Sequence, residues 1–88
     1  MRVLVIDDYV DAVEVWALYL RAAGFDVETA TDGLRGLDAV RAHPPDVVVM
    51  DLQMPGLSGL ELAHTLRTDT ATRHIPLIAV TGMGGDVL

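Results

Sequence analysis

Lysine and cysteine are both absent from this chain, and aromatic residues are few. Without cysteine there can be no disulfide, no thiolate metal site and no cysteine nucleophile, and the composition fits a reducing compartment. All six basic side chains are arginines, against thirteen acidic residues, which gives a formal net charge of −7. Because an acidic domain repels phosphates, neither a nucleic acid nor an anionic membrane surface is expected as a direct partner.

Long apolar segments, internal repeats and low-complexity tracts are also lacking. The opening apolar run, residues 3–6, stops at Asp7 and is too short for a signal peptide or a membrane span. With 88 residues, 51% of them hydrophobic and 22% charged, the chain has ordinary globular composition and room for one domain at most. We therefore expect a soluble domain located in the cytoplasm.

The most informative stretch covers residues 47–59. Four consecutive apolar residues, 47–50, are typical of a strand buried on both faces, as in parallel sheets. The run ends on Asp51. Pro55-Gly56 then marks a turn, and Ser58 is suited to cap a following helix. In open α/β sheets ligands bind beyond the carboxyl ends of the strands, which is where Asp51 falls.

The rest of the chain alternates in the same way between strand and helix patterns. Strands are predicted at 3–6, 25–30, 47–51 and 76–80, with 25–30 alternating as a half-exposed strand near a sheet edge does. Between them, apolar residues recur at helical spacing in three segments. Those predicted to face the core are Val13, Trp16, Ala17, Leu20; Leu34, Leu37, Val40; and Leu60, Ala63, Leu66. The order β-α-β-α-β-α-β predicts a parallel sheet joined by right-handed crossovers.

Local signals place the ends of these helices and the role of two aromatic residues. Asp8 or Asp11 is positioned to cap the first helix, and Gly24 to end it. Trp16 and Tyr19 are interpreted as packing residues rather than ligand contacts.

Polar side chains follow three of the predicted strands. Asp7 and Asp8 follow the first, Asp51 ends the third and Thr81 follows the fourth. If these strands are neighbours, three carboxylates and a hydroxyl converge. Clustered carboxylates raise one another's pKa unless a cation neutralises them, and Mg²⁺ prefers oxygen ligands of this kind. Because an aspartate can act as a nucleophile toward phosphorus, the pattern suggests phosphoryl transfer.

Taken together, these motifs closely resemble the receiver domain of two-component response regulators. They are the Asp7-Asp8 pair, the Asp51-x-x-Met54-Pro-Gly-x-x-Gly59 block and Thr81-Gly82, each after its own strand. The resemblance runs from Val3 to about Gly82. It implies a flavodoxin-like, doubly wound, three-layer α/β/α fold with strands in the order 2-1-3-4, the fifth strand and last helix being missing. Residues 1–88 would then be a partial receiver domain.

The resemblance also implies roles for individual residues. Asp51 would be the phosphoacceptor and Thr81 the switch hydroxyl that moves toward the phosphoryl group. Asp8 would bind Mg²⁺ directly, Asp7 mainly through metal-bound water, and the backbone carbonyl of Gln53 would complete the protein ligands together with Asp51.

The chain departs from the family pattern at its end. Receivers carry a Lys after a fifth strand, and neither is present here. Three explanations remain open: a fragment of a longer gene product, which is the favoured one, a naturally shortened receiver, or a strand supplied by another chain. The uncovered edge of the fourth strand would invite association, including a dimer through that edge, and apolar helix faces would be partly exposed.

Three other functions share parts of this pattern. An aspartate-nucleophile phosphatase places its nucleophile and acid two residues apart on the first strand, whereas Asp7 and Asp8 are adjacent. A flavin-binding domain needs a phosphate loop after that strand, which the acidic pair would repel. A degenerate receiver-like module that acts only in protein–protein interaction stays open, because Asp51 and Thr81 speak against it and the missing Lys speaks for it.

The sequence thus predicts a signalling domain rather than an enzyme with a separate substrate. A histidine kinase or histidine phosphotransfer protein would pass a phosphoryl group to Asp51 in the presence of Mg²⁺. The domain would promote only its own phosphorylation and dephosphorylation. Any output domain would belong to a longer parent chain.

Overall fold

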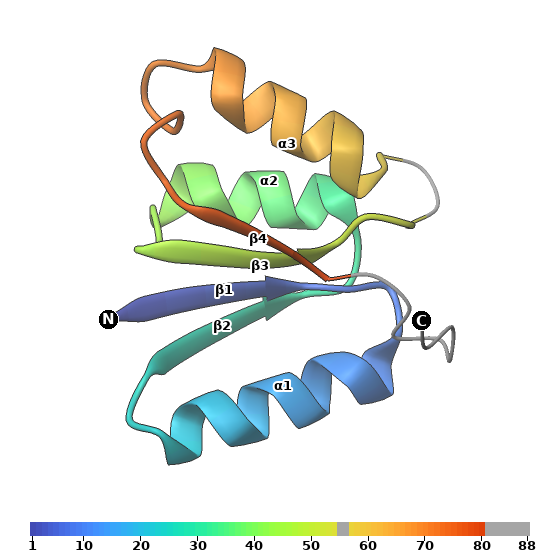
Figure 1. The fold of residues 1–88 in the computed structure, drawn as a ribbon, viewed down its shortest axis with the longest axis vertical. Helices are drawn as coiled ribbons and strands as arrows, with labels where there is room; N and C mark the ends of the chain where they lie inside the picture. Colours follow the sequence, from blue (N-terminus) through green and yellow to red (C-terminus); the bar gives the residue numbers. More distant parts are fainter. Residues whose placement is uncertain (55–56, 81–88) are drawn as a thin grey trace.

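The computed structural model describes residues 1–54 and 57–80, and within these ranges strands and helices alternate along the chain (Figure 1). The strands are β1 (Arg2–Ile6), β2 (Asp26–Ala30), β3 (Val47–Asp51) and β4 (Leu77–Val80). The helices are α1 (Val10–Ala22), α2 (Gly33–Ala42) and α3 (Gly59–Thr68). The predicted order of elements is confirmed, and each strand begins and ends within one residue of its predicted position.

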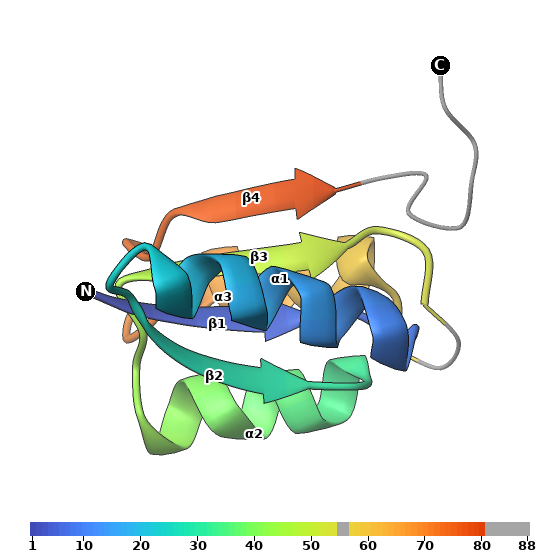
Figure 2. The same ribbon diagram turned by 90° about the horizontal axis from the view of Figure 1, so that it is seen from below.

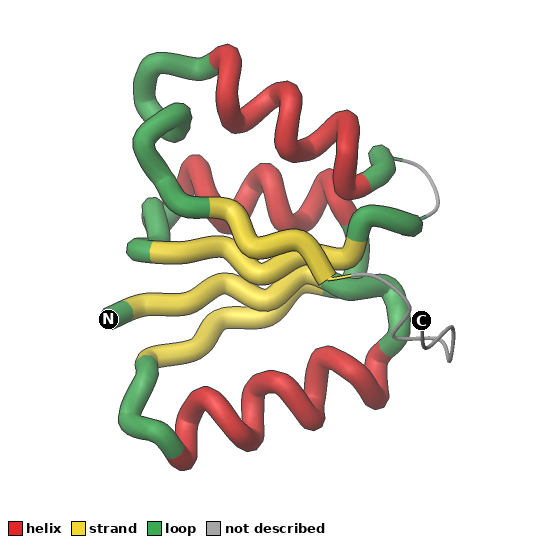
Figure 3. The backbone as a smooth tube through the Cα atoms, viewed as in Figure 1, coloured by secondary structure: helices red, strands yellow, loops and turns green. Residues whose placement is uncertain are grey.

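The described strands form one parallel sheet in the order β2-β1-β3-β4, as expected. Helix α1 lies on one face of the sheet and α2 and α3 lie on the other, which makes three layers (Figures 1 and 3). The half-exposed strand β2 is at an edge, as its alternating pattern predicted. Over the described residues, no helix has the length and apolar content needed to span a bilayer. The flavodoxin-like fold class is confirmed.

Two hydrophobic cores form because successive strand residues point to opposite faces of the sheet. On the side of α2 and α3, even-numbered strand residues such as Leu4, Val48 and Met50 pack with Val40 of α2 and with residues of α3. On the side of α1, the odd-numbered residues contact Trp16 and Leu20 of that helix. Residues 3–6 of β1 and 47–50 of β3 are therefore all apolar, which is the pattern that marked these central strands in the sequence.

Three of the residues predicted to pack in the core are instead exposed. Leu34, Leu60 and Tyr19 face solvent, with 64%, 67% and 71% of their surface accessible. Helix α2 instead packs on the sheet through a glycine, Gly36, whose missing side chain makes room for Ile6. In α3 the fully buried leucines are Leu66, as predicted, and Leu62, which lies two positions beyond Leu60. Helical spacing alone allowed a stripe shifted by one or two positions, and contact with the sheet selected the real one.

The ends of the helices follow their local sequence in part. At the end of α1, Gly24 adopts a φ of +94°, and the N–H groups of Gly24 and Phe25 donate to the carbonyls of Arg21 and Leu20. This pair of bonds is a Schellman motif, which a glycine favours. Ser58 caps α3 as predicted, in a capping box with Glu61. The prediction that Asp8 or Asp11 caps α1 is wrong, because Tyr9 holds that position without a side-chain bond.

A groove of about 470 Å³ opens on the α1 side of the sheet. Its walls are mainly apolar and come from β1, β3, β4 and α1; they include Val3, Val49, Ile78, Trp16 and Leu20. Figure 2 shows β4 to one side of α1, so that on the α1 face of the sheet no described helix covers β4. The prediction was that apolar helix faces would be partly exposed. The structure shows such residues, Leu18 and Leu60 among them, and this groove adds apolar residues of the strands.

Candidate functional site

The three predicted carboxylates meet at the carboxyl edge of the sheet. Strands β1 and β3 are direct neighbours, and Ile6 pairs with Met50, so that Asp7 and Asp51 follow on adjacent strands. The N–H of Asp7 donates to the carbonyl of Ala30 over 3.1 Å, which extends the β1–β2 ladder and fixes the backbone of Asp7. The convergence predicted from the strand order is therefore present.

One ligand oxygen from each of Asp7, Asp8 and Asp51 can be chosen so that all three lie within 4.8 Å of one another. The three residues differ in exposure. Asp7 is buried, with 3% of its surface accessible, Asp51 is half-buried and Asp8 is exposed. The cluster therefore has a closed side, formed by Asp7, and an open side from which a ligand can enter.

Two backbone N–H groups hold the buried and half-buried carboxylates in place. The N–H of Tyr9 donates to Oδ1 of Asp7 over 2.9 Å, and the N–H of Gln53 donates to Oδ1 of Asp51 over 3.0 Å. Each bond joins a carboxylate to the residue two positions later, an Asx turn. The contribution of Tyr9 was missed by the sequence analysis, because a backbone donor leaves no mark in the identity of its residue.

Burial raises the pKa of Asp7 above its ordinary value of 3.8. The hydrogen bond from Tyr9 lowers that pKa and so opposes the shift, whereas the nearby carboxylates of Asp51 and Asp8 raise it further. The ionised cluster is therefore costly by itself. A cation between the carboxylates would remove the cost.

The residues present fit a hard divalent cation. None of the six arginines, all of which lie in the described part of the chain, forms an ion pair with Asp7, Asp8 or Asp51. The donors are carboxylate oxygens, and Mg²⁺ binds through one or two such groups together with waters and phosphate oxygens. No arginine therefore neutralises the negative charge of these three carboxylates, and this favours a metal site.

Two residues of the motif that runs from Asp51 to Gly59 hold the loop after β3 in place. Met54 is buried in the core on the α2–α3 side. Gly59, the first residue of α3, lies against the backbone of Asp51 and Leu52, where a Cβ would overlap the Asp51 carbonyl oxygen. Gly59 therefore lets α3 begin directly behind the central carboxylate.

Two predictions about the site are not tested by the described residues. Thr81 and Gly82 lie outside them, although Asp51 pairs with Val80, the residue before Thr81. For Gln53 the structure places the N–H against Asp51, and the proposed metal contact of its carbonyl stays a prediction.

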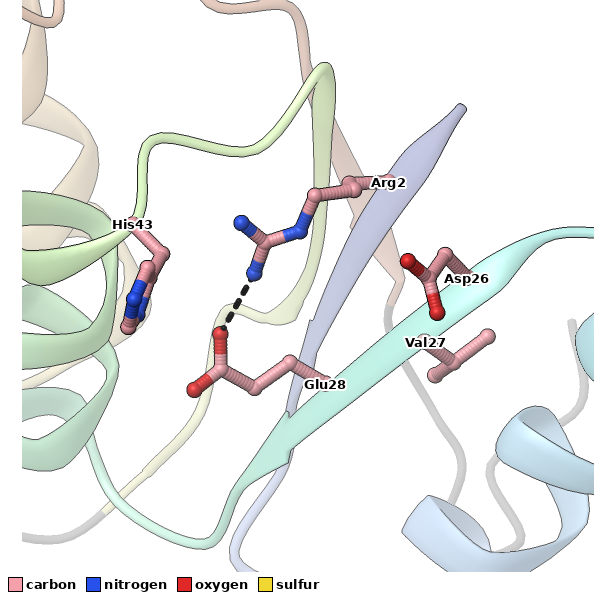
Figure 4. A pocket seen from close by; sticks show the side chains of 5 residues that line it. All are labelled: Arg2, Asp26, Val27, Glu28 and His43. Atoms are coloured by element: carbon pink, nitrogen blue, oxygen red, sulfur yellow. Dashed lines mark hydrogen bonds and ion pairs between the residues drawn. The ribbon is translucent and has the colours of Figure 1, made fainter.

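A second polar hollow, of about 450 Å³, lies at the opposite edge of the sheet (Figure 4). It is lined by Arg2, Asp26, Val27, Glu28 and His43. The Arg2 guanidinium donates to Glu28 Oε1 over 3.0 Å, and its backbone N–H donates to Asp46 Oδ2. Because the guanidinium is already paired and the other charges are acidic, this hollow ties β1 to β2 and offers no evident ligand site.

Comparison with known families gives a match over nearly the whole chain. The model of the response regulator receiver domain matches residues 3–87. Among curated proteins, the polar-differentiation response regulator DivK of Brucella anthropi is 38% identical over 86 residues. That alignment covers 96% of this chain and 70% of DivK.

Solved structures with similar folds agree. The N-terminal domain of a response regulator receiver protein from Methanoculleus marisnigri JR1 has a TM-score of 0.87 and 37% identity. The chemotaxis response regulator CheY4 of Vibrio cholerae has a TM-score of 0.85 and 29% identity. Each comparison covers 89% of this chain, which spans 63% and 65% of the two proteins, less than two thirds in both cases.

Proposed function

This chain belongs to the response regulator receiver domain family of two-component signalling, and we propose that it accepts a phosphoryl group on Asp51 with the help of Mg²⁺. Residues 1–88 would form the part of a receiver domain that runs from its first strand through its fourth. The observation that carries the proposal is the placement of three carboxylates within 4.8 Å at the carboxyl edge of the sheet, with no arginine to neutralise them.

Each carboxylate has a distinct part in this proposal. Asp8 is exposed and would bind the ion directly, while buried Asp7 would act mainly through its water shell. Asp51 and the carbonyl of Gln53 would complete the protein ligands. When bound, Mg²⁺ supplies positive charge that lets an anionic phosphoryl group approach the carboxylates.

Asp51 is suited to in-line attack on phosphorus. Its Oδ1 accepts the N–H of Gln53, so the side chain is oriented before the donor arrives. In the transfer, an Asp51 carboxylate oxygen forms a bond to phosphorus while the bond from phosphorus to the donor's histidine nitrogen breaks. The electron pair of the broken bond stays on the imidazole, which then takes up a proton, and an acyl phosphate remains on Asp51.

The partners follow from this chemistry. The donor would be a histidine kinase or a histidine phosphotransfer protein, and Thr81 would be the hydroxyl that responds to the acyl phosphate. Phosphorylation would then bias a two-state surface read by an output domain or another protein. Pairing of a second chain along the β4 edge, predicted from the sequence, stays a separate prediction.

The test is labelling by a small-molecule phosphodonor, such as acetyl phosphate, in the presence and absence of Mg²⁺. The wild-type chain should gain one phosphoryl group in a Mg²⁺-dependent manner, and Asp51→Asn should gain none. Asp38→Asn, which changes an exposed carboxylate on α2, is the matched control and should label normally.

Two outcomes would contradict the proposal. Labelling of Asp51→Asn at another carboxylate, located by peptide mapping, would move the phosphoacceptor. A folded wild-type chain that takes no label from the small donor or from a phosphorylated histidine protein would instead support the interaction-only module.

A further inference from the structure

The first residue of α2 lies against the segment that leads into α3. Gly33 is buried, and a Cβ at this position would overlap the carbonyl oxygen of Leu57 and stand 3.0 Å from the Leu57 Cβ. Both helices begin at the end of the sheet where the strands finish, which is also the end that carries the acidic cluster (Figure 1). Such a close approach requires glycine, because any side chain would have to displace backbone atoms.

Leu57 is joined to the candidate phosphoacceptor by a short and well-anchored segment. It directly precedes Ser58, which holds the start of α3 in a capping box with Glu61. Gly59 follows and lies against the backbone of Asp51. Because two residues span at most about 7 Å, a displacement at Leu57 cannot be absorbed before it reaches Gly59.

The start of α2 is also connected to the other side of the acidic cluster. Strand β2 ends at Ala30, whose carbonyl accepts the N–H of Asp7, and α2 begins three residues later. The side chain of Asp32 caps that helix. The contact made by Gly33 therefore closes a ring of backbone contacts around the cluster. The ring runs from Asp7 through the starts of α2 and α3 to Asp51, and the paired strands β1 and β3 complete it.

The geometry points to Gly33 as a positioning residue: we propose that its contact with Leu57 holds the start of α3, and through it the Asp51 carboxylate, in the arrangement that binds Mg²⁺, an inference that rests on the metal site of the proposed function. Gly33 acts through Leu57 and has no side chain of its own to bind the ion. A side chain at position 33 would displace Leu57 and the start of α3, and would move Asp51 relative to Asp7 and Asp8.

Two other glycines show what distinguishes Gly33. At Gly36 a Cβ would lie 2.5 Å from Cδ1 of Ile6, the end of a flexible side chain that can turn away. At Gly24, where φ is +94°, a Cβ would meet no atom within 4 Å. Among the glycines in the described part of the chain, it is Gly33 and Gly59 whose missing side chains leave room for backbone atoms.

The test is calorimetric titration with MgCl₂, at a temperature at which circular dichroism shows every variant to be folded. Gly33→Ala should bind Mg²⁺ about five- to tenfold more weakly than the wild type, near the lower end of what loss of an outer contact costs a metal site. Gly24→Ala is the matched control, because it strains the backbone without touching the site. It should melt at a lower temperature and bind Mg²⁺ like the wild type.

Labelling by acetyl phosphate separates positioning from a merely structural effect. In Gly33→Ala the Mg²⁺ concentration that gives half of the maximal labelling rate should rise by about the same five- to tenfold, whereas the rate in saturating Mg²⁺ should fall by no more than about twofold. An effect on the amount of active protein alone would lower the rate by the same factor at every Mg²⁺ concentration.

Hydrogen exchange of the wild-type chain is a second measurement, which needs no variant. The N–H of Arg35 donates to the side chain of Asp32, and the N–H of Gly36 donates to the Asp32 carbonyl. Mg²⁺ should slow exchange of these two amides at least about threefold, because it stabilises the ring that includes the start of α2. The N–H of His43, which donates to Ala39 at the other end of α2, should change by less than about 1.5-fold.

The possible failures are distinguishable. Equal Mg²⁺ affinities of wild type and folded Gly33→Ala would overturn the positioning role and leave the proposed function intact. If Gly33→Ala does not fold, equal slowing of exchange at both ends of α2, or at neither, would overturn that role. A folded wild-type chain that neither binds Mg²⁺ nor takes a label would contradict the proposed function, and the role of Gly33 with it.

Discussion

Gly59 lies so close to Asp51 that any side chain at position 59 would overlap the Asp51 carbonyl oxygen and approach the Cα of Leu52 to 2.6 Å. The first residue of α3 and the candidate phosphoacceptor are thus in direct backbone contact. The two residues are eight positions apart in the sequence. Their contact holds the first residue of α3 against the end of β3, where the Asp51 carboxylate is located.

Replacement of Gly59 by Ala should therefore disturb the site as well as the fold. We expect a loss of about 1–3 kcal/mol in the free energy of unfolding, because the neighbouring atoms are backbone and cannot move aside. Mg²⁺ affinity should fall as well. Ser58→Ala removes the helix cap at a cost of about 1 kcal/mol but leaves Asp51 in place.

Urea unfolding and Mg²⁺ titration of the two variants separate these effects. Both variants should be less stable, and only Gly59→Ala should bind Mg²⁺ more weakly. Equal Mg²⁺ affinities would show that the contact between Gly59 and Asp51 does not position the carboxylate.

Mg²⁺ itself should stabilise the chain. A ligand that binds only the folded state raises the free energy of unfolding by RT ln(1 + [L]/Kd), which is about 2.7 kcal/mol at one hundred times Kd. Thermal melts with and without MgCl₂, at matched ionic strength, should show a rise in Tm for the wild type and a much smaller one for Asp51→Asn. An equal rise in both would place the ion outside the acidic cluster.

The stability of the metal-free chain should depend on pH through Asp7. Its folded-state pKa is raised by burial and by the neighbouring carboxylates, so the folded state binds this proton more tightly than the unfolded state. The resulting stabilisation is fully present below the ordinary pKa of 3.8 and is lost as the pH rises through the raised value. Asp7→Asn cannot lose a proton and should escape this decline.

Melts of the two proteins in EDTA, from about pH 4 to pH 7, measure the difference directly. Asp7→Asn should gain in Tm relative to the wild type as the pH rises. In saturating Mg²⁺ the wild type should instead have the higher Tm, since the ion requires ionised carboxylates. A constant difference between the two proteins in EDTA would contradict the assignment to Asp7.

Two leucines in α3 distinguish the buried face from the exposed one. Leu62→Ala empties a fully buried site and should cost about 2–5 kcal/mol, whereas Leu60→Ala should change stability by no more than about 0.5 kcal/mol. Chemical denaturation of both variants checks this contrast. Comparable losses would mean that the helix packs on the face that its apolar periodicity predicts.

Much of the fold is encoded in local pattern. Residues 3–6 and 47–50 are entirely apolar, and each run is followed directly by a carboxylate, so the central strands and the acidic edge are predictable from these short stretches alone. Ser58 and Gly24 act as local signals because a helix cap depends on residues only a few positions away. The likeness to receiver domains rests on the same local motifs.

Other features depend on contacts between distant parts of the chain. Leu34, Leu60 and Tyr19 are predicted to be buried and are not, since helical periodicity leaves the orientation of a face uncertain by a residue or two. The sheet resolves that uncertainty, as where Ile6 fills the space left by Gly36.

The sequence by itself determined the kind of chemistry, because Asp7, Asp8 and Asp51 follow strands and carboxylates bind hard cations. Only the tertiary structure decided how those carboxylates differ. The neighbouring strands enclose Asp7 and leave Asp8 in solvent, and the backbone N–H groups of Tyr9 and Gln53 orient the carboxylates of Asp7 and Asp51. Burial and backbone direction come from packing over the whole domain, and no short stretch of residues encodes them.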